Sequence, residues 1–359
     1  MIARMFSRME EYERNGQPLS ISLLYSAFTA DIITEYTFAK SYQYLEMPNL
    51  NKDFFDMMEG VHEMGAMARF FKWMLPLLNS LPPTLVTKLQ PSMYQFFVFQ
   101  DEMRNRIREV QAKEAFYKKL DHKTVFHEIL NSSLPAQEKT VDRLWQEAEI
   151  VTIAGTETSA WTLAVVTYYL LSSPEALKKL RTEILAVKEE PVGWKQLEQL
   201  PYLSAVVNEG LRLSFGVTTR LVRACPDEVI TYSAGGKEWA FNPGTPISTT
   251  GALYHLDSSV FPDPLTFKPE RWLSVGRKLD KYLWSFSKGT RQCIGMNLAL
   301  AELYLCLFSI FRRYGGPEDK GLRMELFDTT IEDVNFQYDL FVPFPKKGSQ
   351  GVRVVLRDD

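Results

Sequence analysis

The sequence is poor in cysteine and histidine: its 359 residues include three cysteines and four histidines. The cysteines lie far apart and form no Cys-x-x-Cys pair. This scarcity excludes a disulfide framework and a zinc site built from clustered ligands. His62, His122 and His127 have no ligand-like spacing, so we interpret them as structural or surface residues. His255 is interpreted as a structural histidine as well.

The sequence also lacks an excess of charge of either sign and a long hydrophobic run. Its formal net charge is -3, which gives no support to nucleic-acid binding. Apolar runs stay below the roughly 18 residues that a membrane span requires, so we expect neither a spanning helix nor a signal peptide in the chain as given. With 45% hydrophobic and 24% charged residues, the composition is that of a globular protein with a large core.

One stretch stands out, FSKGTRQCIG at residues 286–295, followed directly by an apolar helical pattern over about residues 296–314. A cysteine just ahead of a helix N-terminus has its thiolate stabilised by the first amides and the helix dipole. Cys293 is therefore a candidate metal ligand. By contrast, Cys306 and Cys225 are interpreted as small core residues, the usual role of an isolated cysteine.

The residues around Cys293 suit a flat, anionic ligand. Gly289 and Gly295 permit tight turns and a close approach of the backbone. Arg291 offers a fixed cation with several donors for a carboxylate. Phe286 adds an aromatic face at the start of the stretch.

A second stretch keeps a helical period over about residues 140–171, and its middle reads AGTETS from Ala154 to Ser159. Gly155 within a helix costs about 1 kcal/mol against alanine, which indicates a locally opened helix that can admit a ligand or water. For Thr158 alone, the ordinary interpretation is a hydrogen bond back to the preceding turn.

Periodicity predicts the remaining elements. Helices are expected over about residues 2–16, 20–38, 53–71, 91–118, 175–188 and 202–213, and strands over about 221–250, 324–345 and 352–356. The charged second half of the 91–118 helix is expected to face solvent. The apolar connection Trp73–Pro83 is either a loop packed over the core or a lid that touches a membrane.

Three patterns together resemble the cytochrome P-450 superfamily of heme-thiolate monooxygenases. Phe-x-x-Gly-x-Arg-x-Cys-x-Gly resembles its heme-binding loop, and Ala-Gly-x-Glu-Thr resembles its oxygen-binding segment. Glu209 and Arg212, which alone would suggest an exposed ion pair, resemble its Glu-x-x-Arg motif, with PERW at Pro269–Trp272 as the partner segment. The resemblance implies a mainly α fold with a small β-rich part, and one heme domain over residues 1–359.

The resemblance also assigns roles to residues. Cys293 is the axial ligand of the iron of heme b, while Thr158 and Glu157 serve oxygen binding and proton delivery. Cofactor contacts fall on Arg291, Arg223 (with Arg220 as the alternative), Phe286, Gly289, Gly295, Ala154 and Gly155. A buried structural network joins Glu209, Arg212 and Arg271. Phe341 and Val342 are weaker candidates for substrate contact.

The implied function is insertion of one atom of O2 into a small, largely apolar organic substrate, by hydroxylation or epoxidation. Electrons would come from NADPH through cytochrome P-450 reductase at the cytosolic face of the endoplasmic reticulum. The cations Arg277, Lys278, Lys281 and Lys288 either dock that partner or form a solvated loop. Details such as TGALYH at residues 250–255 resemble fungal members that tailor terpenoid or polyketide metabolites.

The chain departs from the family pattern at its N-terminus. Members usually run longer there, with a membrane anchor and a Trp-x-x-x-Arg motif, whereas Trp73 is followed four places on by Leu77. We therefore expect an N-terminally truncated chain. Two alternatives stay open: a heme-deficient, inactive fragment, and a heme-thiolate enzyme with peroxide-driven or rearrangement chemistry. The Glu157–Thr158 pair argues against the second.

Overall fold

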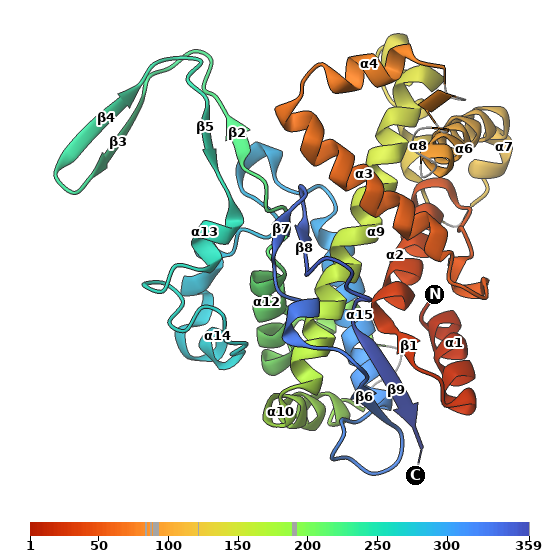
Figure 1. Cartoon of the computed structure of the whole chain (residues 1–359), viewed down its shortest axis with the longest axis vertical. Helices are drawn as coiled ribbons and strands as arrows, with labels where there is room; N and C mark the ends of the chain where they lie inside the picture. The colour runs from red at the N-terminus through yellow and green to blue at the C-terminus, as the bar shows by residue number, and fades with distance from the viewer. Residues whose placement is uncertain (83–84, 87, 89–92, 121, 189–191, 359) are drawn as a thin grey trace.

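The computed structural model describes residues 1–82, 85–86, 88, 93–120, 122–188 and 192–358, and the side chains of residues 75, 78, 79 and 275–277 lie outside that description. Figure 1 shows helices gathered around one long central helix, with short strands at the margins. The described helices are α1 (Ile2–Asn15), α2 (Ile21–Phe38), α3 (Lys52–Phe70), α4 (Met74–Ser80), α6 (Met93–Ala112), α7 (Glu114–Tyr117), α8 (Val125–Leu130), α9 (Val141–Leu171), α10 (Pro174–Leu185), α11 (Trp194–Leu197), α12 (Pro201–Ser214), α13 (Gly251–His255), α14 (Glu270–Val275) and α15 (Met296–Arg313).

The described strands form small antiparallel sheets. They are β1 (Leu19–Ser20), β2 (Leu221–Arg223), β3 (Ile230–Ala234), β4 (Lys237–Phe241), β5 (Ile247–Thr249), β6 (Arg323–Leu326), β7 (Tyr338–Asp339), β8 (Pro343–Phe344) and β9 (Arg353–Arg357). One sheet has the order β1-β9-β6, so the two ends of the chain pair with each other. The others are the pairs β2–β5, β3–β4 and β7–β8, and the β3–β4 hairpin projects away from the helices (Figure 1).

The central helix is α9. It begins after Thr140, whose side chain accepts a hydrogen bond from the Arg143 N–H and so satisfies one of the donors left unpaired at a helix start. Pro174, two residues after the C-cap Ser172, prevents its continuation. The helix packs against α2, α6, α12 and α15, and these contacts bury most of its C-terminal half. This packing fixes the position of α9 and so of the residues on its remaining open face.

Gly155 sets the close approach of α2 to α9. A Cβ atom built on Gly155 would lie 2.6 Å from Cγ1 of Ile33, so glycine is required by the packing. Nearby, Thr29 donates to the carbonyl of Thr156 at 2.6 Å, and Tyr25 hydrogen-bonds Thr167. The helix runs unbroken through this point. The opened helix that the sequence suggested is therefore absent at Gly155, and the glycine faces α2.

By length and composition, α9 is also the one helix among the described residues that could cross a bilayer, which the sequence interpretation did not anticipate. Its most apolar window is 56% buried inside the protein, however. The same residues fill the main hydrophobic core, which extends from Met5 to Leu356. In this structure α9 is thus a core helix.

The mainly α fold with a small β-rich part is as predicted. Strands occur within residues 324–345 as predicted, but β6, β7 and β8 are short and are separated by loops. One local expectation was wrong. The charged half of α6 is not all solvated: Arg106 is buried, donates to Glu102 and the carbonyl of Lys40, and lies over the Tyr42 ring.

Candidate active site

The open face of α9 carries the predicted oxygen-binding segment. Ile150 is 61% exposed, and Ala154, one turn further on, is exposed as well. The hydroxyl of Thr158 donates to the carbonyl of Ala154 at 2.9 Å, the backbone contact expected for a lone threonine in a helix. That bond uses the hydroxyl proton and leaves the oxygen lone pairs of Thr158 open. Thr158 can therefore accept a hydrogen bond from a group placed against this face.

Glu157 is paired with a histidine that the sequence interpretation treated as structural or surface. Nε2 of His62, on α3, lies 2.5 Å from Oε2 of Glu157, and Nδ1 lies 3.1 Å from the carbonyl oxygen of Leu340. The two side chains are 12% and 21% exposed. Burial lowers the pKa of His62, but the hydrogen bond and charge of Glu157, with the Leu340 carbonyl, outweigh it and raise that pKa above its usual value.

The loop that carries Cys293 is held by its own backbone. The Cys293 N–H donates to the carbonyl of Phe286 at 2.9 Å, and the Gln292 N–H donates to Gly289 at 3.1 Å. Gly289 has a φ of +79°, a left-handed conformation that glycine adopts without strain. Gly295 is the N-cap of α15, so Cys293 lies just before the helix, as the sequence predicted.

The Cys293 thiol is accessible, and its pKa differs from the expectation. Desolvation of the sulfur raises the pKa of the thiol, and the backbone N–H of Gly295 lowers it by less. The predicted stabilisation of the thiolate by the helix start is therefore outweighed in the protein alone. A bound cation at the sulfur would reverse this balance, because a metal-ligating thiol is deprotonated.

The donor set around Cys293 fits heme. Among the described residues, no group of three or more His, Cys, Asp or Glu side chains could hold a metal ion. An iron bound to Cys293 must therefore bring its other ligands with it, as heme does. Next to the sulfur, Ile294 is 99% exposed, an apolar side chain suited to a large apolar ring. The open Cys293 and Ile294 supply the contacts that such a group needs.

The Cys293 loop is connected to the Thr158 segment through α15. Glu302, in the second turn of α15, hydrogen-bonds Ser159, the residue after Thr158. At about 1.5 Å per residue, the N-terminus of α15 lies about 9 Å along the axis from that contact. The sulfur and the open face of α9 thus belong to one region of the molecule. Glu302 itself had no sequence signal beyond being a charged residue in an apolar helix.

Glu209 is the centre of a buried polar network. Its carboxylate accepts from Arg212 Nε and Nη2, at 2.9 and 2.8 Å, and from Arg271 Nε at 3.0 Å. It also accepts from the Lys268 N–H and from Nε1 of Trp272, both at 2.9 Å, which the sequence analysis did not predict. Both arginines continue to backbone carbonyls between residues 255 and 266. The network ties α12 to the loop that leads to α14.

The residues proposed to hold carboxylates of a cofactor are exposed cations. Arg291, Arg220 and Arg223 are all exposed. Arg223 lies at the end of β2, and its guanidinium donates to the neighbouring carbonyl of Val222. Phe286 is half-buried against the main core. The role of each toward a cofactor stays a prediction.

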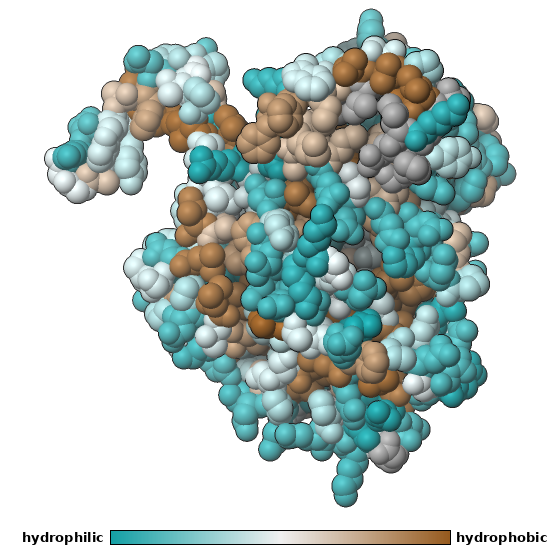
Figure 2. All heavy atoms as spheres, viewed as in Figure 1, coloured by the Kyte–Doolittle hydropathy of each residue, from teal (hydrophilic) through white to brown (hydrophobic). Residues whose placement is uncertain are grey.

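The apolar segment after α3 is exposed. Trp73 is 63% exposed and Leu77 49%, and Phe70 at the end of α3 is 82% exposed. Pro83, the end of the predicted lid, lies outside the described residues. In Figure 2 hydrophobic residues gather over this end of the molecule. Of the predicted substrate contacts, Phe341 is 49% exposed in the β7–β8 turn, and Val342 is half-buried.

The remaining cysteines and histidines differ in how deeply they are buried. Cys306 is buried as predicted, but Cys225 is half-exposed, so the core interpretation of Cys225 was wrong. His255 is buried, and its Nε2 accepts from the Trp284 N–H at 2.9 Å. Burial and the charge of Arg212 lower the pKa of His255 to about 3, so it is neutral and structural. His127 is buried, whereas His122 lies on the surface.

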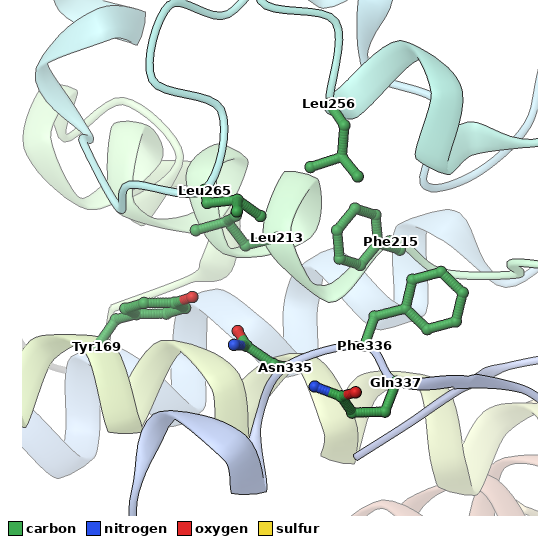
Figure 3. Close-up of a pocket in the computed structure, with 8 residues that line it drawn as sticks. All are labelled: Tyr169, Leu213, Phe215, Leu256, Leu265, Asn335, Phe336 and Gln337. Carbon is green, nitrogen blue, oxygen red and sulfur yellow. The ribbon is translucent and has the colours of Figure 1, made fainter. Parts of the chain in front are cut away.

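A separate hollow of about 240 Å³ contains none of the predicted site residues. Figure 3 shows Leu213, Phe215 and Phe336 facing the side chains of Asn335 and Gln337 around it. Tyr169 on α9 lines one side and lies 11 residues after Thr158 along the helix. The hollow therefore lies beyond the Thr158 segment along α9 and is distinct from the candidate active site.

The comparisons with known proteins agree on one family. A family model described as cytochrome P-450 matches residues 1–330. The chain is 42% identical, over 98% of its length and 69% of the relative's, to cytochrome P-450 monooxygenase tpcC of Cochliobolus heterostrophus. It is 36% identical, over 99% of its length and 69% of the relative's, to N-acetyltryptophan 6-hydroxylase ivoC of Emericella nidulans.

The fold has a similar solved structure. A crystal structure of a cytochrome P-450 aligns with all of this chain and 72% of its own length, with a TM-score of 0.72 and 17% sequence identity. At that identity the likeness concerns the fold.

Proposed function

Because the chain belongs to the cytochrome P-450 family and is a monooxygenase of that family, we propose that it hydroxylates or epoxidises a small, largely apolar organic molecule. Its similarity to fungal monooxygenases supports a biosynthetic role. The product that we propose is a secondary metabolite of terpenoid or polyketide type. The proposed cofactor is heme b, which all of the proposed chemistry requires.

One observation carries the proposal: Cys293 is an accessible thiol fixed at the start of α15, without other metal ligands around it. The absence of other metal ligands refers to the described residues, which include the whole Cys293 loop. When bound, heme ligated by a thiolate activates O2 for insertion into unreactive bonds. The protein contributes the ligand, the proton supply and the pose of the substrate.

The residues of this chain have separate tasks in that scheme. The backbone bonds at Phe286 and Gly289 hold Cys293 in place, and the Glu209 network fixes the preceding loop. Ile150 and Ala154 provide an apolar surface on α9 that excludes water. Thr158 accepts a hydrogen bond at its open lone pairs. Glu157, the residue before Thr158, holds a proton together with His62.

The proposed partner is NADPH-cytochrome P-450 reductase. Lys278, Lys281 and Lys288 are exposed near the Cys293 loop, and Lys288 donates to the carbonyl of Asp280. The side chain of Arg277 lies outside the described residues. These cations suit an acidic protein surface. Membrane contact through Phe70, Trp73 and Leu77 would place the enzyme at the cytosolic face of the endoplasmic reticulum.

The test is the absorption spectrum of the purified, heme-loaded chain, reduced in the presence of carbon monoxide. We expect a strongly red-shifted Soret band that is lost in Cys293→Ala and kept in Cys225→Ala, a matched control. Absence of heme, or a band typical of a neutral ligand, would contradict the proposal. Turnover with peroxide but none with NADPH and reductase would favour peroxide-driven chemistry.

A further inference from the structure

Both ring nitrogens of His62 face oxygen atoms, and this determines where protons reside. Nδ1 lies 3.1 Å from the backbone carbonyl oxygen of Leu340, which can only accept, so Nδ1 carries a hydrogen. Nε2 lies 2.5 Å from Oε2 of Glu157. At that distance a proton lies between ring and carboxylate. The pair therefore holds one proton more than a neutral ring beside an ionised carboxylate.

His62 joins three elements that are distant in the sequence. It lies on α3, Glu157 lies on the Thr158 turn of α9, and Leu340 lies in the turn between β7 and β8. The ring of Phe344, on β8, lies 5.6 Å from the His62 ring. One imidazole thus spans the site helix, the helix above it and the turn that carries Phe341.

A second contact between α3 and the same turn does not depend on protonation. Arg69, two turns further along α3, donates to Thr219 and to the carbonyl of Asp339. Thr218 donates to the Asp339 carboxylate at 2.9 Å, and its amide donates to the carbonyl of Phe341 at 3.0 Å. Arginine stays charged at all ordinary pH values. The His62 contact is therefore the titratable half of a two-point attachment.

We propose that His62 is a positioning residue that holds the Glu157 carboxylate and fastens α3 and the β7–β8 turn to α9 while the pair is protonated. Loss of the shared proton leaves a ring lone pair facing an ionised carboxylate, so the contact opens and Glu157 becomes free to turn toward Thr158. The role of Glu157 in proton delivery rests on the proposed function. The attachment of α3 and the β7–β8 turn to α9 does not depend on that function.

The charges around the pair do not replace this contact. On α3, Glu59 and Glu63 flank His62 in sequence, and Lys52 and Lys347 act on Glu59. On β7, Asp339 is engaged by Arg69 and Thr218. From α9, Glu157 is the one ionised side chain that interacts with the ring among the residues described.

The direction of the pH effect follows from the raised pKa of His62. A histidine whose folded pKa lies above its unfolded pKa contributes stability that is complete below the unfolded value. That contribution is lost as the pH rises through the folded value. The attachment should therefore be closed in mildly acidic solution and open in alkaline solution.

Hydrogen exchange of the heme-loaded protein, followed by mass spectrometry and corrected for the intrinsic pH dependence, measures the attachment in residues 336–344. Between about pH 6 and about pH 9, we expect protection in this segment to fall by about tenfold or more. His62→Gln keeps hydrogen bonds but does not titrate, so its protection should be flat with pH. His122→Gln, at a surface histidine, should follow the wild type. A flat wild-type profile, or an unchanged slope in His62→Gln, would overturn the proposal.

A second measurement needs no variant at position 62. In the reduced, carbon-monoxide-bound protein, nitrogen NMR of the histidine rings should show His62 titrating above the ordinary pKa of a histidine side chain, and Glu157→Gln should remove that increase. A pKa of His62 below the ordinary value would overturn the proposal. The carbon-monoxide spectrum reports heme ligation separately, so failure of the proposed function is distinguishable from failure of the attachment.

Discussion

Arg212 donates through Nε and Nη2 to both oxygens of Glu209, at 2.9 and 2.8 Å, and neither side chain is exposed to solvent. A carboxylate placed in this way neutralises a charge that has no access to water. The same carboxylate also accepts from Arg271, and all three residues reach the loop before α14. The position of that loop therefore depends on two side chains of α12, Glu209 and Arg212.

Replacing Glu209 with glutamine should destabilise the protein by about 3–5 kcal/mol, the usual cost of leaving a buried charge without its partner. Here both Arg212 and Arg271 would lose their counter-charge. Urea unfolding measures the loss. The matched control is Glu198→Gln, which breaks a partly exposed pair with Lys195 and should change the midpoint little. Equal effects of the two substitutions would contradict a structural role for the network.

Thr158→Val should separate consumption of NADPH from formation of product. The substitution removes the hydroxyl but keeps the shape of the side chain, so the α9 surface stays intact while a hydrogen-bonding group is lost. We expect product per NADPH to fall by about a hundredfold or more, because a group that assists proton transfer typically contributes about 10²–10⁴-fold. Thr158→Ser restores the hydroxyl and should restore the yield. If valine and serine behave alike, the hydroxyl has no part in the reaction.

Reversing two charges at Lys278 and Lys281 should slow turnover driven by the reductase. Both side chains are exposed, and rim charges act mainly on association rates. The effect should therefore shrink as salt is added. Reduction by dithionite should stay unchanged, and Lys195→Glu, a remote exposed cation, serves as the control. Unchanged reductase-driven rates would discard docking at this surface.

Phe70 and Trp73 should contribute to membrane attachment. They are 82% and 63% exposed, and burying one large apolar side chain is worth about 1.5–3 kcal/mol. Replacing both with serine should lower binding to phospholipid vesicles by at least about tenfold. Leu253, an equally exposed apolar residue on α13, provides the control when replaced with serine. Equal losses from both surfaces would show that the segment after α3 has no special affinity for lipid.

The candidate site residues that the sequence singled out are the contiguous ones. The Cys293 loop, the Ala154–Thr158 segment and the Glu209 motif each occupy a few successive residues, so spacing alone identifies them. The pattern also predicted that α15 follows the cysteine and that α9 spans the molecule. These predictions depend on local chain geometry, which a sequence encodes directly.

The parts that the sequence could not predict depend on residues brought together from afar. His62 meets Glu157 across 95 positions, and its own neighbours show no ligand spacing. Arg106 has a charged sequence context, yet packing on Tyr42 buries it. Gly155 was interpreted through its helix alone, whereas Ile33 of another helix explains it. In each case the missing information is tertiary contact.

Glu302 belongs to the same group and gives a pH-dependent prediction. It is 4% exposed, its Oε1 has no hydrogen-bond partner in the part of the chain that is described, and burial raises its pKa to about 8. Ser159, which hydrogen-bonds the carboxyl, lowers that pKa by less. At neutral pH the folded protein therefore keeps a proton on Glu302 that the unfolded chain releases.

Bound protons that unfolding releases make stability fall as the pH rises. Because of Glu302, the free energy of unfolding should fall by up to about 1.4 kcal/mol per pH unit, from the ordinary pKa of a glutamate up to about pH 8. Glu302→Gln is neutral throughout and can still bond Ser159, so it should match the wild type near the acid end of that window and be increasingly more stable toward pH 8. Urea unfolding at both ends measures the difference. Glu325→Gln, at a partly exposed carboxylate whose pKa is lowered by Arg323, should show a deficit that is already complete above the ordinary pKa of a glutamate and therefore stays constant across the same window. A gain for Glu302→Gln that is the same at every pH would mean that the carboxyl is already ionised in the fold, and that α15 contains a buried charge where the structure indicates a neutral acid.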